Sequence, residues 1–138
     1  MIVSAPMGAA VGIAAAVLTA LLGRIAGFDR DRAFYPTLLI VVASYYVLFA
    51  AMGGSARTLV VELVVMGIFA AAAVAAFRGR LWIAAAGLVA HGTFDMLVHG
   101  RVVANAGMPA WWPAFCAAYD VAAGLFLVWL LVRERPSA

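Results

Sequence analysis

Five side chains that can carry a proton or hold a metal ion stand inside otherwise apolar stretches of this sequence. They are the carboxylic acids Glu62, Asp95 and Asp120 and the imidazoles His91 and His99. Burying a charged group in hydrocarbon costs roughly 2.5–3.5 kcal/mol on insertion scales, so such residues need a partner and often mark a function. Two imidazoles with several carboxylates form a suitable ligand set for zinc, iron or manganese.

The spacing of these residues places several of them on one surface. His91, Asp95 and His99 follow one another at intervals of four residues. A helix turns about 100° per residue, so the three side chains drift by only about 80° and share a face. Asp120 is flanked four residues away on each side by small residues, among them Cys116, and small residues let another helix come close.

Known catalytic motifs do not narrow the chemistry further. The stretch from His91 to His99 matches no standard zinc motif, and the sequence contains no phosphate-binding loop, no Gly-x-Ser-x-Gly and no Cys-x-x-Cys. The polar residues are therefore interpreted from their chemistry and their positions.

The chain that carries these residues has the composition of a membrane protein. It is 68% hydrophobic and 11% charged, whereas a soluble domain is nearer half apolar and a quarter charged. Apolar runs of roughly 20 residues can cross the hydrocarbon core as helices. The sequence predicts an all-α integral membrane bundle of about five transmembrane helices, forming one domain (1–138), multi-pass in the cell inner or plasma membrane. The expected spans are 2–22, 34–52, 58–77, 81–98 and 110–132.

The first expected span carries a stripe of small residues. Gly8, Gly12, Ala16 and Ala20 recur every four residues. Helices in lipid associate through close dispersion contacts, which small residues permit. This stripe predicts a tightly packed neighbouring helix.

The basic residues predict an orientation. All nine are arginines, and they lie between or after the apolar runs. Five spans would leave only Arg57 and Arg101 on one side, and the positive-inside rule assigns the richer side to the cytoplasm. We therefore expect the N-terminus outside, the C-terminus in the cytoplasm and no nucleic-acid partner for the net charge of +3. The cytoplasmic group is Arg24, Arg30, Arg32, Arg78, Arg80, Arg133 and Arg135.

Depths estimated from this topology bring the polar groups together. At 1.5 Å per residue, Asp95 and Glu62 lie roughly 6 Å, and His91 and Asp120 roughly 12 Å, below the outer surface. The sequence thus predicts an outward-opening pocket among spans 58–77, 81–98 and 110–132, with span 34–52 near it. The candidate metal ligands are His91, Asp95, His99, Asp120 and Glu62.

Three further residues are candidates for binding a substrate beside that pocket. Tyr45 and Tyr46 lie at roughly 9–11 Å depth, and they point in different directions, so at most one faces the cluster. Asn105 lies in the loop 100–109 and is expected mainly to form a turn before the last span. It is also placed to cover the cluster.

A metal site is the first of three interpretations. A divalent ion would neutralise the acids and could activate water to hydrolyse a lipid-like substrate arriving from the outer leaflet. In its use of His and Asp within helices the pattern is similar to membrane-embedded zinc hydrolases of the ceramidase and progestin-receptor type. Those proteins have seven spans and a different motif order.

Two other interpretations stay open. Chains of Asp, Glu and His line proton and cation paths in transporters, although the cytoplasmic half of this chain is nearly all apolar, so a homo-oligomer would have to supply the path. Alternatively, the cluster is a structural network in which, for example, His91 pairs with Asp120 and holds two helices together. The lipid bilayer is the partner common to all three.

Overall fold

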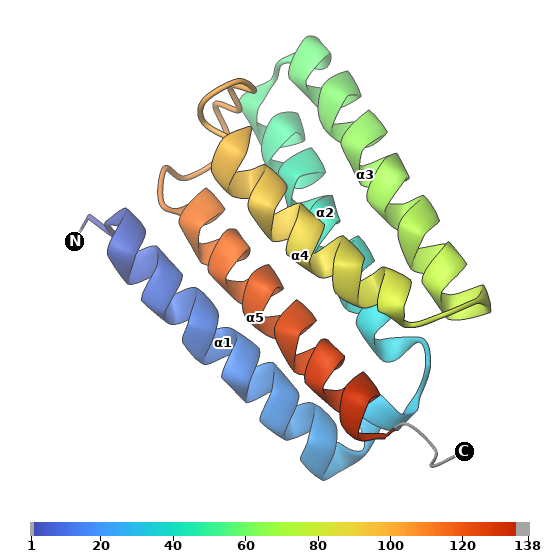
Figure 1. Ribbon diagram of the computed structural model, residues 1–138. Helices are drawn as coiled ribbons and strands as arrows, with labels where there is room; N and C mark the ends of the chain where they lie inside the picture. Colours follow the sequence, from blue (N-terminus) through green and yellow to red (C-terminus); the bar gives the residue numbers. More distant parts are fainter. Residues whose placement is uncertain (1, 135–138) are drawn as a thin grey trace.

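The computed structural model describes residues 2–134, so Arg135 of the expected cytoplasmic group lies outside the described residues. Regular structure in this range consists of five α-helices and one short 3-10 helix (Figure 1). Their bounds are α1 Ala5–Ala26, η1 Phe28–Arg30, α2 Phe34–Gly53, α3 Ala56–Arg78, α4 Trp82–Leu97 and α5 Trp112–Arg133.

Serine and glycine residues explain several of these helix ends. The Ser4 side chain accepts a hydrogen bond from the backbone N–H of Met7, and Ser55 begins α3 in the same way. Such caps satisfy N–H groups that have no partner within the helix. Gly27 and Gly54 end α1 and α2 with φ of 79° and 72°, the left-handed conformation that glycine adopts without strain.

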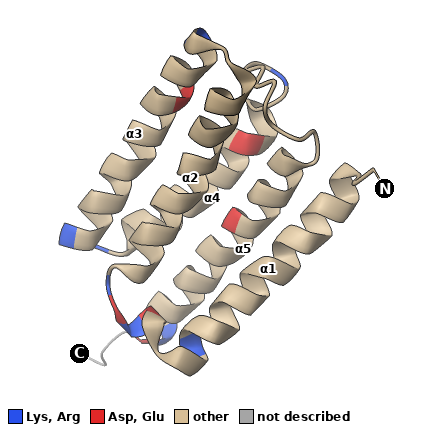
Figure 2. Cartoon of the chain, turned by 180° about the vertical axis from the view of Figure 1, so that it is seen from behind, with Lys and Arg blue, Asp and Glu red and all other residues tan. Residues whose placement is uncertain are grey.

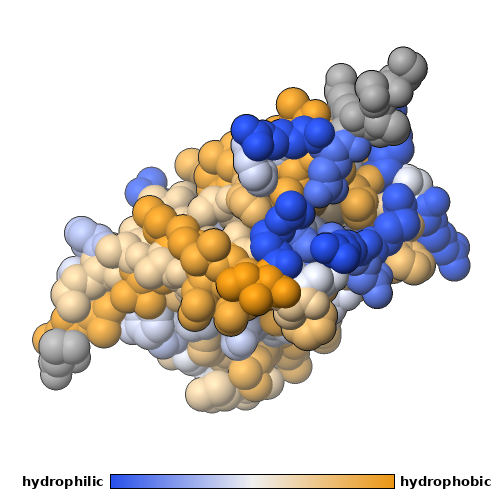
Figure 3. All heavy atoms as spheres, turned by 90° about the horizontal axis from the view of Figure 1, so that it is seen from below, coloured by the Kyte–Doolittle hydropathy of each residue, from blue (hydrophilic) through white to orange (hydrophobic). Residues whose placement is uncertain are grey.

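The helices run side by side along a common axis, with their connections at two ends (Figure 1). Helix α1 lies against α5, α5 against α4, and α3 against both α2 and α4. We call the end with the α2–α3 turn and the loop 98–111 the loop end, and the opposite one the arginine end. Basic segments lie mainly at the arginine end (Figure 2), and hydrophilic side chains gather on this end of the molecule (Figure 3).

The lengths of the helices confirm a membrane-type helical bundle. Helices α1, α2, α3 and α5 have 20 to 23 residues each and are apolar enough to cross a membrane. Helix α4 has 16 residues, about 24 Å of rise, and falls short of the roughly 20 residues that a span needs. That α4 also crosses, and that the N-terminus lies outside, stay predictions.

The small-residue stripe of α1 is the contact surface for α5, as expected. Gly8, Gly12 and Ala16 are buried, and Ala20 is partly buried. A Cβ atom added at Gly8 would lie 2.7 Å from the carbonyl oxygen of Trp111. The two backbones therefore approach more closely than a side chain at that position would allow.

Arg32 links two segments of the chain at the arginine end. Its guanidinium donates hydrogen bonds to the carbonyl oxygens of Ala76, Phe77 and Gly79 at distances of 3.3, 3.1 and 2.6 Å. The last carbonyls of a helix have no partner within it. Arg32 satisfies those of α3 and thereby ties the α1–α2 connection to the end of a distant helix.

The core changes character along the bundle axis. Toward the arginine end the buried side chains are apolar, among them Leu39, Ala73, Ala84, Leu88, Leu127 and Leu130. Toward the loop end the core holds six polar residues, none more than 7% exposed: Glu62, His91, Asp95, His99, Asn105 and Asp120. Among the described residues, the buried acids, imidazoles and Asn105 thus lie in one half of the bundle.

Candidate metal centre

Glycines on α4 and α5 allow these helices to bring an imidazole and a carboxylate together. A Cβ atom at Gly92 would lie 2.9 Å from the carbonyl oxygen of Ala117, and Gly124 meets α4 in a similarly tight contact. Because the backbones are this close, His91 on α4 reaches Asp120 on α5. The imidazole Nδ1 donates a hydrogen bond of 2.6 Å to the Asp120 Oδ2.

A second carboxylate faces the same imidazole nitrogen. Asp95 Oδ2 lies 3.3 Å from His91 Nδ1, one helical turn along α4. The single N–H at Nδ1 is directed to Asp120, so Asp95 Oδ2 is left without a hydrogen bond. The pairing of His91 with Asp120 expected from the sequence is therefore present, but it does not satisfy every group involved.

Three polar atoms of His91, Asp95 and Asp120 have no hydrogen-bond partner within the described residues. They are His91 Nε2, Asp95 Oδ2 and Asp120 Oδ1, and all three side chains are 0% exposed. An unsatisfied buried polar atom costs roughly 1–3 kcal/mol, and such atoms are rare in native proteins unless a water or an ion meets them. The site therefore has unused capacity to bind.

Cys116 completes a group of ligand-type atoms. It lies one turn before Asp120 on α5, is 1% exposed, and its Sγ donates to Asp120 Oδ2 at 3.7 Å. His91, Asp95, Cys116 and Asp120 each offer one ligand atom, and these four atoms lie within 4.8 Å of one another. We call these four residues the inner cluster.

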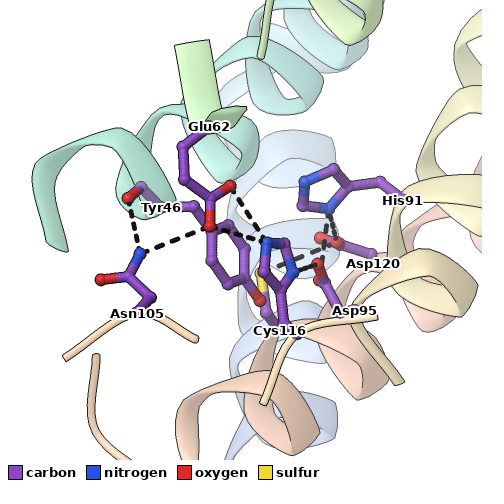
Figure 4. Close-up of polar contacts among 8 residues, drawn as sticks. Tyr46, Glu62, His91, Asp95, Asn105, Cys116 and Asp120 are labelled. Atoms are coloured by element: carbon purple, nitrogen blue, oxygen red, sulfur yellow. Dashed lines mark hydrogen bonds and ion pairs between the residues drawn. The ribbon is translucent and has the colours of Figure 1, made fainter. Parts of the chain in front are cut away.

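A second group, nearer the loop end, consists of Glu62, His99 and Asn105, and we call it the outer cluster. His99 follows the end of α4 and donates from Nδ1 to Asp95 Oδ1 at 3.0 Å. Its Nε2 faces both carboxylate oxygens of Glu62 at 3.1 Å. Asn105 Nδ2 donates to Glu62 Oε1 at 3.4 Å and to the carbonyl oxygen of Tyr46 at 3.1 Å (Figure 4).

The contacts of His99 favour its charged form. Burial lowers the pKa of His99, whereas the hydrogen bonds to Asp95 and Glu62 raise it, and the net result is a pKa above the ordinary value. Both ring nitrogens donate to carboxylates, which is the arrangement of an imidazolium. His99 therefore has no free nitrogen to offer a metal ion in this arrangement.

Aromatic rings enclose both clusters. Tyr46 stacks on the His99 ring with centroids 3.7 Å apart and an angle of 6° between planes. Phe69 meets His91 edge-on at 4.7 Å, and Phe94 meets His99 at 5.1 Å. These rings remove the clusters from solvent, which strengthens every electrostatic interaction within them.

The structure places the residues singled out from the sequence in three groups. His91, Asp95 and Asp120 lie in the inner cluster, and His99 and Glu62 lie beside it in the outer cluster. Of the two tyrosines, Tyr46 faces the clusters, while Tyr45 is 39% exposed and contacts Trp112. Asn105 bridges α2 and Glu62. Their roles as metal ligands and as substrate-binding residues stay predictions.

Sequence reasoning did not assign Cys116 a role. A lone cysteine in an apolar span is usually an inert small residue. The available signal was its spacing of four residues from Asp120, which places both side chains on one face of α5.

No protein-family model, curated protein or solved structure gives a significant match to this chain. The function of the molecule is therefore inferred from its own side chains. The chain forms a helical, membrane-type bundle with a buried His/Asp/Cys cluster in one half.

Proposed function

We propose that this protein binds a divalent metal ion at the inner cluster and uses it to activate water against a lipid-like substrate. One observation carries the proposal: four ligand-type atoms lie within 4.8 Å of one another at the place where buried polar atoms lack partners. Imidazole and carboxylate ligands together suit zinc, with iron and manganese as the alternatives.

Ion binding would relieve an electrostatic problem in the inner cluster. The two clusters together hold three carboxylic acids, Glu62, Asp95 and Asp120, and only the two imidazoles His91 and His99 to face them. A divalent ion balances the carboxylates of Asp95 and Asp120 and replaces the proton that lies between His91 Nδ1 and Asp120 Oδ2. Binding therefore releases protons, as it does wherever ligands must be deprotonated.

The four residues divide into two roles. Catalytic zinc sites use three protein ligands and leave a fourth position for water. We assign His91, Asp95 and Asp120 to hold the ion and place the fourth position beside Cys116. An ion held by these residues would lower the pKa of a bound water to about 7 and would thereby supply hydroxide for hydrolysis of an ester or amide. The hydroxide would replace the leaving group, which would take up the proton lost by the water.

Metal content of the purified full chain tests the proposal. The protein is extracted in detergent without chelators, and its metals are measured by mass spectrometry. Asp120→Asn removes a ligand charge at nearly constant shape, and Glu134→Gln is the control, because Glu134 lies at the end of the same helix and is exposed. We expect close to one ion per chain in the wild type and the control, and a large loss in Asp120→Asn.

A clear negative result is also defined. Wild-type protein without bound metal, whose thermal stability does not change on adding zinc or manganese, would rule out the metal site. If Asp120→Asn then only lowers stability, the inner cluster is a structural network between α4 and α5.

Proton transfer is the second candidate, because the two clusters form an unbroken chain of contacts. It runs from Glu62 through His99, Asp95 and His91 to Asp120, with every step at 3.3 Å or less. Such chains carry protons in membrane transporters. The apolar core toward the arginine end interrupts the path within one chain, so this function needs an oligomer.

Liposomes distinguish proton transfer from metal chemistry. The full chain is reconstituted, a pH gradient is imposed, and internal pH is followed with a trapped dye. Proton transfer predicts dissipation that Asp95→Asn abolishes, because Asp95 links the two clusters. Traces as slow as those of empty liposomes would exclude it.

A further inference from the structure

A cleft on the flank of the bundle reaches the inner cluster from the side. It lies between α2 and α5 and encloses about 200 Å³. Val41 and Tyr45 at its rim are 41% and 39% exposed, so the cleft is accessible from the surface of the bundle that the bilayer would surround. The residues that matter below are Val41 and Tyr45 of α2 and Trp112, Phe115, Cys116 and Tyr119 of α5.

The lining of the cleft selects apolar matter. Aromatic rings and aliphatic side chains make up nearly all of it, and no charged side chain among residues 2–134 lines it. An engineered apolar cavity of about 150 Å³ binds benzene, so a cleft of this volume accommodates a segment of hydrocarbon chain. Along α5 it extends from Trp112 to Tyr119, about 10 Å of helix.

Cys116 connects the cleft to the inner cluster. Its side chain lines the cleft, and its Sγ lies 3.7 Å from Asp120 Oδ2. Of the four inner-cluster residues, only Cys116 also lines this cleft. A molecule in the cleft would therefore lie beside the position that the proposed function leaves for water.

A buried donor gives the cleft a polar preference. Trp112 lines it near the loop end, and the indole Nε1 is buried with no hydrogen-bond partner in the described part of the chain. An indole N–H can only donate. A bound molecule that carries an acceptor oxygen next to its apolar segment would satisfy this donor once the Trp112 ring turns toward the cleft.

We propose that this cleft binds the acyl chain of a bilayer lipid, with the adjoining carbonyl oxygen accepting from Trp112 Nε1. The chain enters sideways between α2 and α5 and lies along the rings of Phe115 and Tyr119. The carbonyl group then lies within about one helical turn of Cys116. This names the substrate class of the proposed function and rests on it for the chemistry, but the binding itself does not require the ion.

Photolabelling in nanodiscs tests the binding. The probe is a phosphatidylcholine with a diazirine on one acyl chain, and labelled residues are mapped by mass spectrometry. Val41→Trp fills the cleft from its rim, and Val64→Trp is the matched control on the exposed face of α3. We expect labels to concentrate on Phe115 and Tyr119, to fall about tenfold in Val41→Trp, and to persist in Val64→Trp.

A second variant covers the case in which Val41→Trp does not fold. Trp112→Phe keeps the aromatic ring and removes only the donor, so labelling at Phe115 should fall about fivefold, as expected for one lost hydrogen bond. Labels spread evenly over the exposed faces of α1, α3 and α5, and insensitive to both cleft variants, would overturn the proposal and indicate ordinary surrounding lipid.

The two proposals fail separately. Asp120→Asn should lose metal and keep the labelling, because it leaves the cleft intact. Wild-type protein that is labelled in the cleft but binds no metal would retain a lipid site and refute the metal centre. Protein that binds metal but shows no preferential labelling would do the reverse.

Discussion

The inner and outer clusters use the same kinds of side chain and differ in how completely those side chains are satisfied. In the outer cluster both nitrogens of His99 donate to carboxylates and Asn105 Nδ2 donates to Glu62, while Asn105 Oδ1 has no partner among the described residues. In the inner cluster one nitrogen of His91 and one oxygen of each aspartate have no partner in the part of the chain that the structure describes. The satisfied imidazole of His99 stabilises the fold, whereas the unpartnered nitrogen of His91 and the unpartnered carboxylate oxygens are available to a ligand.

The backbone explains why the two clusters differ. His99 comes from the loop 98–111, which is not held in helical geometry, and both of its ring nitrogens contact carboxylates. His91 and Asp120 come from two helices held in close contact at Gly92, so their side chains have little freedom to rearrange. A rigid pair of helices can therefore keep polar atoms unpaired for a ligand.

The largest expected effect is the loss of stability when the outer cluster is disrupted. His99→Ala leaves Glu62 without its imidazole partner and Asp95 with His91 alone, and breaking buried pairs in this way should cost about 3–5 kcal/mol of unfolding free energy. Thermal and denaturant unfolding in detergent measure it. Zinc should not restore this loss. A cost below about 1 kcal/mol would show that the outer cluster does not stabilise the fold.

Zinc affinity, in contrast to stability, should depend more on the inner cluster than on the outer cluster. Asp120→Asn should weaken zinc binding about a hundredfold, near 2.7 kcal/mol, because it removes a ligand. Glu62→Gln acts only through His99 and Asp95, and it should weaken binding about tenfold. Calorimetric titration measures both and also counts the protons released. Equal losses in the two variants would mean that the clusters form a single site.

Helix spacing is the next test of the comparison. Gly92→Ala places a Cβ atom 2.9 Å from the carbonyl oxygen of Ala117 and should cost about 1–3 kcal/mol by forcing α4 away from α5. It should also lengthen the distance from His91 to Asp120 and weaken zinc binding. Gly67→Ala on α3 is the control, since its Cβ meets nothing within 4 Å and should gain about 0.8–1.0 kcal/mol.

The smallest expected effect concerns the loop. Asn105→Ala removes two hydrogen bonds that hold the loop 98–111 against α2 and α3, and it should cost about 1 kcal/mol. Hydrogen exchange in the loop should rise while zinc affinity stays unchanged. A marked loss of zinc binding would instead make Asn105 part of the inner site.

The sequence predicted the framework of this arrangement well, because hydropathy and helical spacing are local signals. Four expected spans reappear as long apolar helices, and acids and imidazoles from three segments meet in one half of the bundle. The spacing of four residues placed His91 beside Asp95, and the pairing of His91 with Asp120 is present.

What the sequence could not supply depends on tertiary contact. Asparagine is common in turns, and only the fold shows that the amide of Asn105 reaches Glu62. Tyr45 and Tyr46 are adjacent and chemically alike, so only helix packing decides which one stacks on His99. Helix α4 ends at Leu97, two residues before His99, because the chain turns at Gly100 with φ of 78°.

Arg32 shows that an arginine counted in the positive-inside rule can also have a structural role. Its flat guanidinium offers several N–H groups in a fixed fork, and three carbonyls at the end of α3 occupy it. Lysine at this position would leave the signal for membrane insertion intact, yet its compact ammonium could not span all three acceptors. The number of arginines therefore does not show how the short α1–α2 connection is held in place. Because its guanidinium is bound to these carbonyls, Arg32 is also not available to bind lipid phosphates.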